Sequence, residues 1–148
     1  MARKALIATH GHLADGFKSA VELLMGSENQ IDTVNAYTEE EPDDYTSRIV
    51  NFINGIGDSD EGVIFTDLAG GSVNQRVVKT LSEFPGGIPD NVFLITESNL
   101  MAILAIMLEA RPLSASVIEE TTSQTYPTLI QLKVAVDSES DDEEAFLD

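Results

Sequence analysis

The sequence KALIATHGH, residues 4–12, decides the fold that we expect for this chain. Its apolar run, residues 5–8, predicts a short buried strand, which stops at Thr9 and His10 before a helical pattern begins. In open α/β sheets, ligands bind outside the carboxyl ends of the strands. His10 is therefore the first candidate for chemistry, and His12 is the only other histidine in the chain.

Strand-like and helix-like patterns alternate along the rest of the chain. Pro42 suits the first turn of its helix, and a last strand, residues 129–136, stands apart from the alternation. Repeated alternation of this kind predicts a doubly wound, mainly parallel α/β sheet flanked by helices. The other expected strands are residues 31–37, 62–67 and 91–96, and the expected helices are residues 13–26, 42–55, 73–84, 100–110 and 113–123.

The 148 residues suit a single domain, which we expect to span residues 1–136. Residues 137–148 carry seven acids and no base, and are expected to be a disordered acidic tail. There is no cysteine, which excludes disulfides and thiolate metal sites. No signal peptide is recognisable, so we expect a cytoplasmic protein.

The formal net charge of −18 bears on the partners. A strongly acidic surface repels nucleic acid and favours a basic protein partner, although solubility alone also explains it. The longest apolar run, residues 100–108, is far short of the ~20 residues of a membrane span, so no membrane insertion is expected. Because this run is apolar on every face, it indicates either a fully covered core helix or a homodimer interface, to which the last strand could add by strand exchange.

If the first and third strands are neighbours, His10 and Asp67 meet at one edge of the sheet. A carboxylate that accepts from one imidazole N–H fixes the tautomer and leaves the other nitrogen as a nucleophile. Gly70, Gly71 and Ser72 follow at the start of a helix, where backbone N–H groups favour an anion. This combination predicts phosphoryl transfer through a phosphohistidine.

Each of these features also has a simpler explanation. The histidine could be structural, Asp67 could be a helix cap, the Gly-Gly-Ser sequence could be an ordinary tight turn, and His12 is expected to be merely exposed. No Walker lysine motif and no metal-ligand cluster are present, so we expect neither a nucleotide site, nor a metal, nor a cofactor.

Two segments resemble the signatures of a known family. THGHLADG, residues 9–16, resembles the Ser/Thr-His-Gly-x-x-Ala-x-Gly signature of the mannose-family IIA component of the bacterial sugar phosphotransferase system (PTS). TDLAGGSVN, residues 66–74, resembles that family's Asp-Leu-x-Gly-Gly-Ser-x-x-Asn signature. NL at residues 99–100 resembles a third segment, in which Ser98 stands where glycine is common.

The resemblance implies a doubly wound α/β fold and a homodimer with exchanged C-terminal strands. It implies that His10 accepts phosphate from the histidine phosphocarrier protein HPr and donates it to a IIB component, in support of sugar uptake. Asp67 would orient His10, while Ser72 and the neighbouring Gly70, Gly71 and Thr9 would bind the phosphoryl group. The chain would be a stand-alone IIA phosphotransferase, and its sugar (mannose, fructose, sorbose, N-acetylhexosamine or gluconate) stays open.

Three other classes of protein are weighed against this one. The phosphotransfer subunit of dihydroxyacetone kinase shares the fold and differs in its partners. A histidine phosphatase or mutase would need arginine in place of Thr9 and a second pocket histidine, for which His12 is too close in sequence. A flavodoxin-like binding module would need a hydroxyl-rich phosphate loop after the first strand and a tryptophan to stack on flavin, and the chain lacks both.

Overall fold

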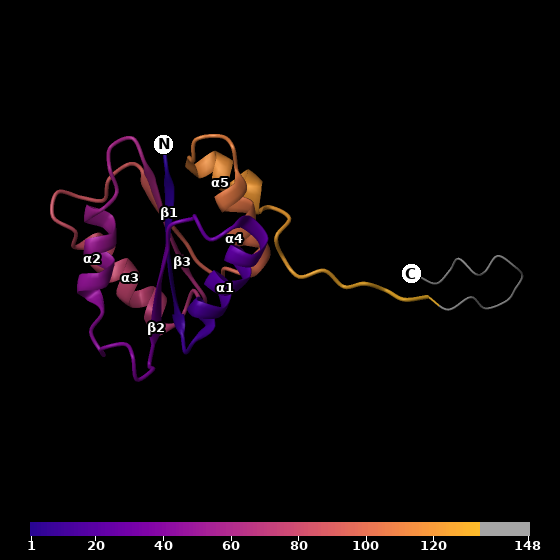
Figure 1. Cartoon of the computed structure of the whole chain (residues 1–148), viewed down its shortest axis with the longest axis horizontal. Helices are drawn as coiled ribbons and strands as arrows, with labels where there is room; N and C mark the ends of the chain where they lie inside the picture. The colour runs from indigo at the N-terminus through magenta and orange to yellow at the C-terminus, as the bar shows by residue number, and fades with distance from the viewer. Residues whose placement is uncertain (134–148) are drawn as a thin grey trace, which may run out of the picture.

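The computed structural model describes residues 1–133 and contains a four-stranded parallel sheet in the order β2-β1-β3-β4. Helices cover both faces of this sheet, with α2 and α3 on one side and α1, α4 and α5 on the other (Figure 1). The doubly wound α/β prediction is therefore confirmed. The strands are β1 (Arg3–His10), β2 (Ile31–Ala36), β3 (Glu61–Thr66) and β4 (Val92–Ile95), and the helices are α1 (Leu13–Met25), α2 (Thr46–Asn54), α3 (Ser72–Ser82), α4 (Leu100–Leu108) and α5 (Ala115–Thr122).

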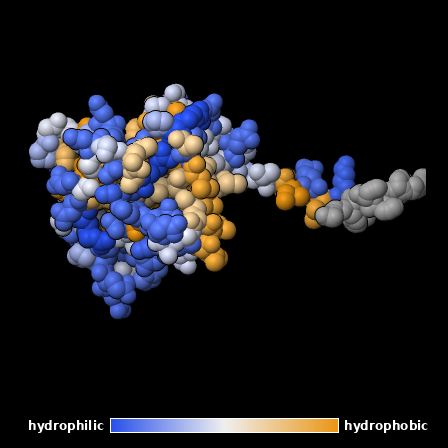
Figure 2. Space-filling view, turned by 45° about the horizontal axis from the view of Figure 1, so that its top comes forward, coloured by the Kyte–Doolittle hydropathy of each residue, from blue (hydrophilic) through white to orange (hydrophobic). Residues whose placement is uncertain are grey.

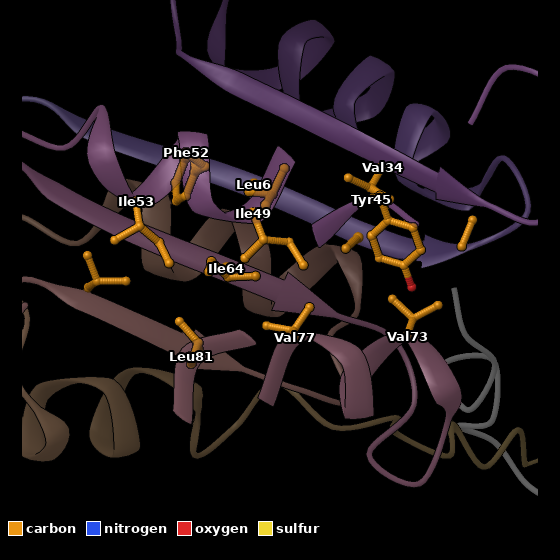
Figure 3. Packing of buried hydrophobic residues seen from close by; sticks show 13 residues of the cluster. Leu6, Val34, Tyr45, Ile49, Phe52, Ile53, Ile64, Val73, Val77 and Leu81 are labelled. Atoms are coloured by element: carbon orange, nitrogen blue, oxygen red, sulfur yellow. The ribbon is translucent and has the colours of Figure 1, made fainter. Parts of the chain in front are cut away.

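The apolar runs of the central strands are continuous because both of their faces are buried. On β1, Leu6 packs into the core beneath α2 and α3, whereas its neighbour Ile7 packs into the core beneath α1 and α4. Figure 3 shows the first of these cores, in which Ile49 and Val77 of the two helices meet Ile64 of β3. The two cores hold the sheet rigidly, so that the residues at the ends of β1 and β3 have fixed positions.

The second helix begins later than the sequence indicates. α2 starts at Thr46, so the prediction that Pro42 lies in the first turn of this helix is wrong. The reason is a set of interactions in the preceding loop, where the buried Glu41 carboxylate accepts from the backbone N–H of Asn35 at 3.1 Å and pairs with Arg48 at 2.7 Å. We call these two interactions of Glu41 the loop clip. They hold the loop between β2 and α2 in an irregular conformation, and α2 begins only after Asp44, whose carboxylate accepts from the N–H of Thr46 at 2.9 Å.

The described part of the predicted last strand, residues 129–133, does not form a strand in the single chain. Residues 129–133 have no regular structure, and Figure 1 shows this segment leaving the body of the molecule. Leu129, Ile130 and Leu132 are exposed. A strand forms only where it pairs with another strand, and residues 129–133 pair with none of the described strands. The rest of the predicted strand, residues 134–136, and the predicted tail, residues 137–148, lie outside the described residues.

Helix α4 is only partly covered. It begins where Oδ1 of Asn99 accepts from the N–H of Ala102 at 2.8 Å, which caps the helix. Met101 and Leu108 are exposed, so the fully covered alternative is wrong for the single chain. Figure 2 shows hydrophobic surface on the side of the molecule from which the C-terminal segment leaves. With nine residues α4 is far too short to cross a membrane, and the described part of the chain contains no helix that could.

Candidate active site

His10 and Asp67 meet at the carboxyl edge of the sheet. β1 and β3 are parallel neighbours with Ala8 opposite Thr66, so both strands deliver their next residues to the same place. The Nδ1 atom of His10 lies 3.0 Å from Oδ2 of Asp67, which also accepts from the backbone N–H of His10 at 2.9 Å. The other carboxylate oxygen accepts from the N–H of Leu68 at 3.0 Å. The expectation that these two side chains meet is thus confirmed.

The surroundings of Asp67 keep it charged. Burial by itself would raise the pKa of this carboxyl, but the hydrogen bonds from the backbone N–H and the imidazole of His10 outweigh burial and lower the pKa below its ordinary value of 3.8. A carboxylate can only accept, so Nδ1 carries the imidazole proton. The lone pair then lies on Nε2, which no hydrogen bond within residues 1–133 engages, and His10 is half-exposed.

The Gly-Gly-Ser turn lies against the imidazole ring. Gly71 precedes α3 and donates its N–H to the carbonyl of Leu68 at 3.0 Å, which closes the turn. A Cβ atom at Gly71 would lie 2.9 Å from Cε1 of His10, whereas one at Gly70 would meet nothing within 4 Å. Only Gly71 therefore has to be glycine for the ring to fit. Ser72 is the first residue of α3, whose first-turn N–H groups have no partner within the helix.

The two remaining candidate residues, Thr9 and His12, have side-chain partners outside the His10–Asp67 pair. Thr9 is 1% exposed, and its hydroxyl accepts from the N–H of Ala14 at 2.7 Å, which ties β1 to α1. This geometry gives no support to a role for Thr9 in binding phosphate. His12 is exposed, as predicted, and its Nε2 lies 3.7 Å from the Glu40 carboxylate. It has no contact that would make it a partner of His10.

A buried hydrogen-bond pair supports the turn that carries Asp67. The Thr66 hydroxyl donates to Oδ1 of Asn74 at 2.6 Å, and the amide of Asn74 donates to the carbonyl of Ala69 at 3.0 Å. Both residues lie in the segment that resembles the second signature, where one residue and not two separates Ser72 from Asn74, and residue type and spacing gave no indication of how they bond. The pair fixes the turn between β3 and α3, and with it the position of the carboxylate.

Tyr37 is a further residue of the site that the sequence did not predict. We expected it inside the second strand, but it lies just beyond β2 with φ +67° and is exposed. Its ring stacks on His10 with 5.6 Å between the ring centroids and 27° between the planes. Its hydroxyl is hydrogen-bonded to Oγ of Ser72. The available signal was its position, since β2 pairs with β1 and ends at the same edge.

Fold and site together define an α/β protein built around a histidine–carboxylate pair at the edge of a parallel sheet. The family model EIIA-man, described as PTS system fructose IIA component, matches residues 4–88. This chain therefore belongs to the EIIA-man family and is a phosphotransfer component of a sugar phosphotransferase system. No curated protein sequence matches it.

Solved structures agree with the family. A Klebsiella pneumoniae protein, assigned provisionally as a phosphoenolpyruvate-dependent sugar PTS permease, is 31% identical, with 84% of this chain and 87% of that chain covered and a TM-score of 0.68. Two more distant structures share the fold. The PTS IIA protein associated with the fucose utilization operon of Streptococcus pneumoniae is 20% identical, covering 86% and 93% of the two chains at a TM-score of 0.68. The mannose/sorbose specific IIA subunit of Enterococcus faecalis is 14% identical, covering 91% and 100% at a TM-score of 0.66.

Proposed function

We propose that His10 is a phosphoryl carrier, which accepts phosphate from HPr on Nε2 and donates it to a IIB component. The observation that carries this proposal is the 3.0 Å contact between Nδ1 of His10 and Oδ2 of Asp67. It leaves Nε2 as the nitrogen with a lone pair, at a half-exposed position that a partner protein can reach. Membership of the EIIA-man family supports phosphotransfer as the chemistry.

The reaction needs no group beyond the two proteins. The lone pair on Nε2 of His10 attacks the phosphorus atom of the phosphohistidine of HPr, and the phosphorus–nitrogen bond in HPr breaks, with its electron pair returning to the HPr imidazole. The proton on Nδ1 stays in place, so the ring of His10 gains positive charge, which the carboxylate of Asp67 stabilises. Ser72 and the first-turn N–H groups of α3 would receive the phosphoryl oxygens. Transfer to IIB reverses these steps.

The charge at this edge fits basic partners. Glu39, Glu40, Asp43 and Asp44 lie in the loop between β2 and α2, and Glu97 follows β4, so acids flank His10 on two sides. Such a rim attracts a positively charged surface and speeds the encounter. We assign these acids to the recognition of HPr and of IIB.

Transfer of phosphate in a reconstituted system tests the proposal. The full chain is incubated with phosphoenolpyruvate, the first general enzyme of the system and HPr, and its intact mass is measured. We expect the addition of one phosphoryl group, labile in acid and stable in base, and fragmentation that maps it to His10. A chain that stays unphosphorylated while HPr becomes phosphorylated would overturn the proposed function.

Alanine at Gly71 should slow this transfer. The added methyl group would lie 2.9 Å from Cε1 of His10 and 3.2 Å from Cβ of Leu68, so the imidazole must shift relative to Asp67. Because φ at Gly71 is −84°, alanine fits the backbone and the fold is retained. We expect the rate of phosphorylation to fall about tenfold or more, since small misplacements of a reacting group cost that much. Gly70→Ala, which meets no atom within 4 Å, is the matched control, and equal rates in the two variants would contradict this packing argument.

We also propose a homodimer in which residues 129–136 pair with β4 of a second copy, with residues 1–136 forming one domain. β4 is an edge of the sheet, and the apolar Leu129, Ile130 and Leu132 are each at least 75% exposed. A stable fold rarely leaves such a row of side chains in water. Light scattering should give twice the 16.0 kDa of one chain, and Ile130→Asp should shift the mass toward one chain. A wild-type mass of one chain at all concentrations would exclude the dimer.

A further inference from the structure

Tyr37 touches both of the groups that the proposed function places at the phosphoryl group. Its ring lies on the imidazole of His10, and its hydroxyl is bonded to that of Ser72. Two hydroxyl groups carry two protons, and the bond between them uses only one. One O–H donor at this point is therefore left over.

The backbone holds Tyr37 in an unfavourable conformation to achieve this. Among residues 1–133, Tyr37 and Glu97 are the two non-glycine residues with positive φ, and each follows a strand at the edge where His10 lies. Local hydrogen bonds fix the turn, including that from the hydroxyl of Thr38 to the carbonyl of Asn35 at 2.7 Å. Residues kept in a sparsely populated region of φ and ψ concentrate at functional sites, so this strain calls for a functional reason.

The pair of hydroxyls faces open space. Tyr37 and Ser72 line a hollow of about 500 Å³ between α2 and α3, together with Arg76 and residues around it. Tyr37 also lines a second hollow of about 510 Å³ beside Gly11. Tyr37 thus borders both hollows, and its ring is stacked on the imidazole of His10.

We propose that Tyr37 is a ligand of the phosphoryl group on His10. When Nε2 becomes phosphorylated, the hydroxyls of Tyr37 and Ser72 turn from each other and both donate to phosphoryl oxygens. The stacked ring keeps the imidazole in place and shields one face of the phosphoryl group from water. This inference rests on the proposed function, and it adds a residue that neither the signatures nor the sequence patterns identify.

The equilibrium of phosphate between HPr and this chain tests the inference. Phosphorylated HPr and the full chain are mixed without phosphoenolpyruvate, and the phosphorylated fraction of each is read by intact mass. For Tyr37→Phe we expect the equilibrium constant to shift about tenfold toward phospho-HPr, the effect of losing one hydrogen bond to a charged group. Tyr126→Phe, which alters another exposed tyrosine, is the control and should behave as wild type.

The direction in which Tyr37→Phe shifts the equilibrium shows whether Tyr37 binds the phosphoryl group or only holds the hydroxyl of Ser72. If Tyr37 only occupied Ser72, phenylalanine would free that hydroxyl, and phosphorylation of His10 would stay equal or increase; either result would overturn the inference. The imidazole resonances of His10 report the stacking, which Tyr37→Phe should retain and Tyr37→Ala should lose. Failure of the wild-type chain to accept phosphate would instead overturn the proposed function, so the two failures are distinguishable.

Discussion

Glutamine in place of His10 is expected to abolish phosphorylation of this chain by phospho-HPr. The amide nitrogen of glutamine has no lone pair available for attack on phosphorus, so the nucleophile is removed altogether. Its N–H group can still donate to Asp67, and its side chain fills part of the space beside Gly71. The loss should therefore be chemical and not a consequence of unfolding. Intact mass after incubation with the complete phosphate-donor system measures it.

His12→Gln is the matched control for this variant. His12 is the only other histidine, and it is exposed, with no contact to His10. It should accept phosphate at a rate close to that of the wild type. Equal phosphorylation of His10→Gln and the wild type would refute the assignment of His10, and loss of label in His12→Gln alone would transfer the role to that residue.

The meeting of His10 and Asp67 could be predicted because it depends on topology. An apolar run that stops at a polar residue predicts a strand, and it also predicts that this polar side chain lies at the carboxyl end of the strand. Parallel neighbours then bring two such ends together. The prediction also needed the assumption that β1 and β3 are adjacent strands, and the pairing of Ala8 with Thr66 confirms this assumption.

Tyr37 could not be predicted in the same way, because its role depends on the backbone beyond a strand end. A tyrosine at the end of residues 31–37 fits a strand pattern, and positive φ is common only for glycine. The positive φ of Tyr37 results from the loop clip of Glu41 and from the hydrogen bond of the Thr38 hydroxyl to Asn35. Both of these interactions join residues that are several positions apart in the sequence. Similarly, residues 129–133 have the apolar composition of a strand, but composition does not supply the edge with which they would pair.

Asparagine in place of Asp67 should slow phosphoryl transfer about 10³- to 10⁴-fold, the size of effect seen when a carboxylate that orients a catalytic histidine becomes an amide. The amide is nearly the same shape, and with its carbonyl at the position of Oδ1 it can still accept from the backbone N–H of Leu68. Its NH₂ group, however, can donate to Nδ1 of His10. The imidazole proton then moves to Nε2, and the lone pair needed for attack is lost. Nitrogen chemical shifts of His10 should report this change of tautomer, and single-turnover kinetics with phospho-HPr should report the rate.

Asp44→Asn separates this effect from a general loss of negative charge. Asp44 lies at the same edge, but it pairs with Arg76 and not with His10. Its replacement should alter the rate only through the encounter with HPr, by less than about tenfold and in a salt-dependent way. Comparable losses in the two variants would mean that Asp67 acts through charge alone.

The lowered pKa of Asp67 predicts a second difference between this variant and the wild type. A carboxyl whose pKa is lower in the folded than in the unfolded chain stabilises the fold at pH values above its unfolded pKa, and this contribution is lost as the pH falls through the folded pKa. For Asp67 the contribution is therefore complete at neutral pH and disappears below its ordinary pKa of 3.8. Asp67→Asn lacks the titrating group, so the free energy of unfolding should differ from that of the wild type at neutral pH, and this difference should change at strongly acidic pH. Parallel curves of unfolding free energy against pH would show that the hydrogen bonds from His10 do not favour the charged carboxylate, and the tautomer argument would then lose its basis.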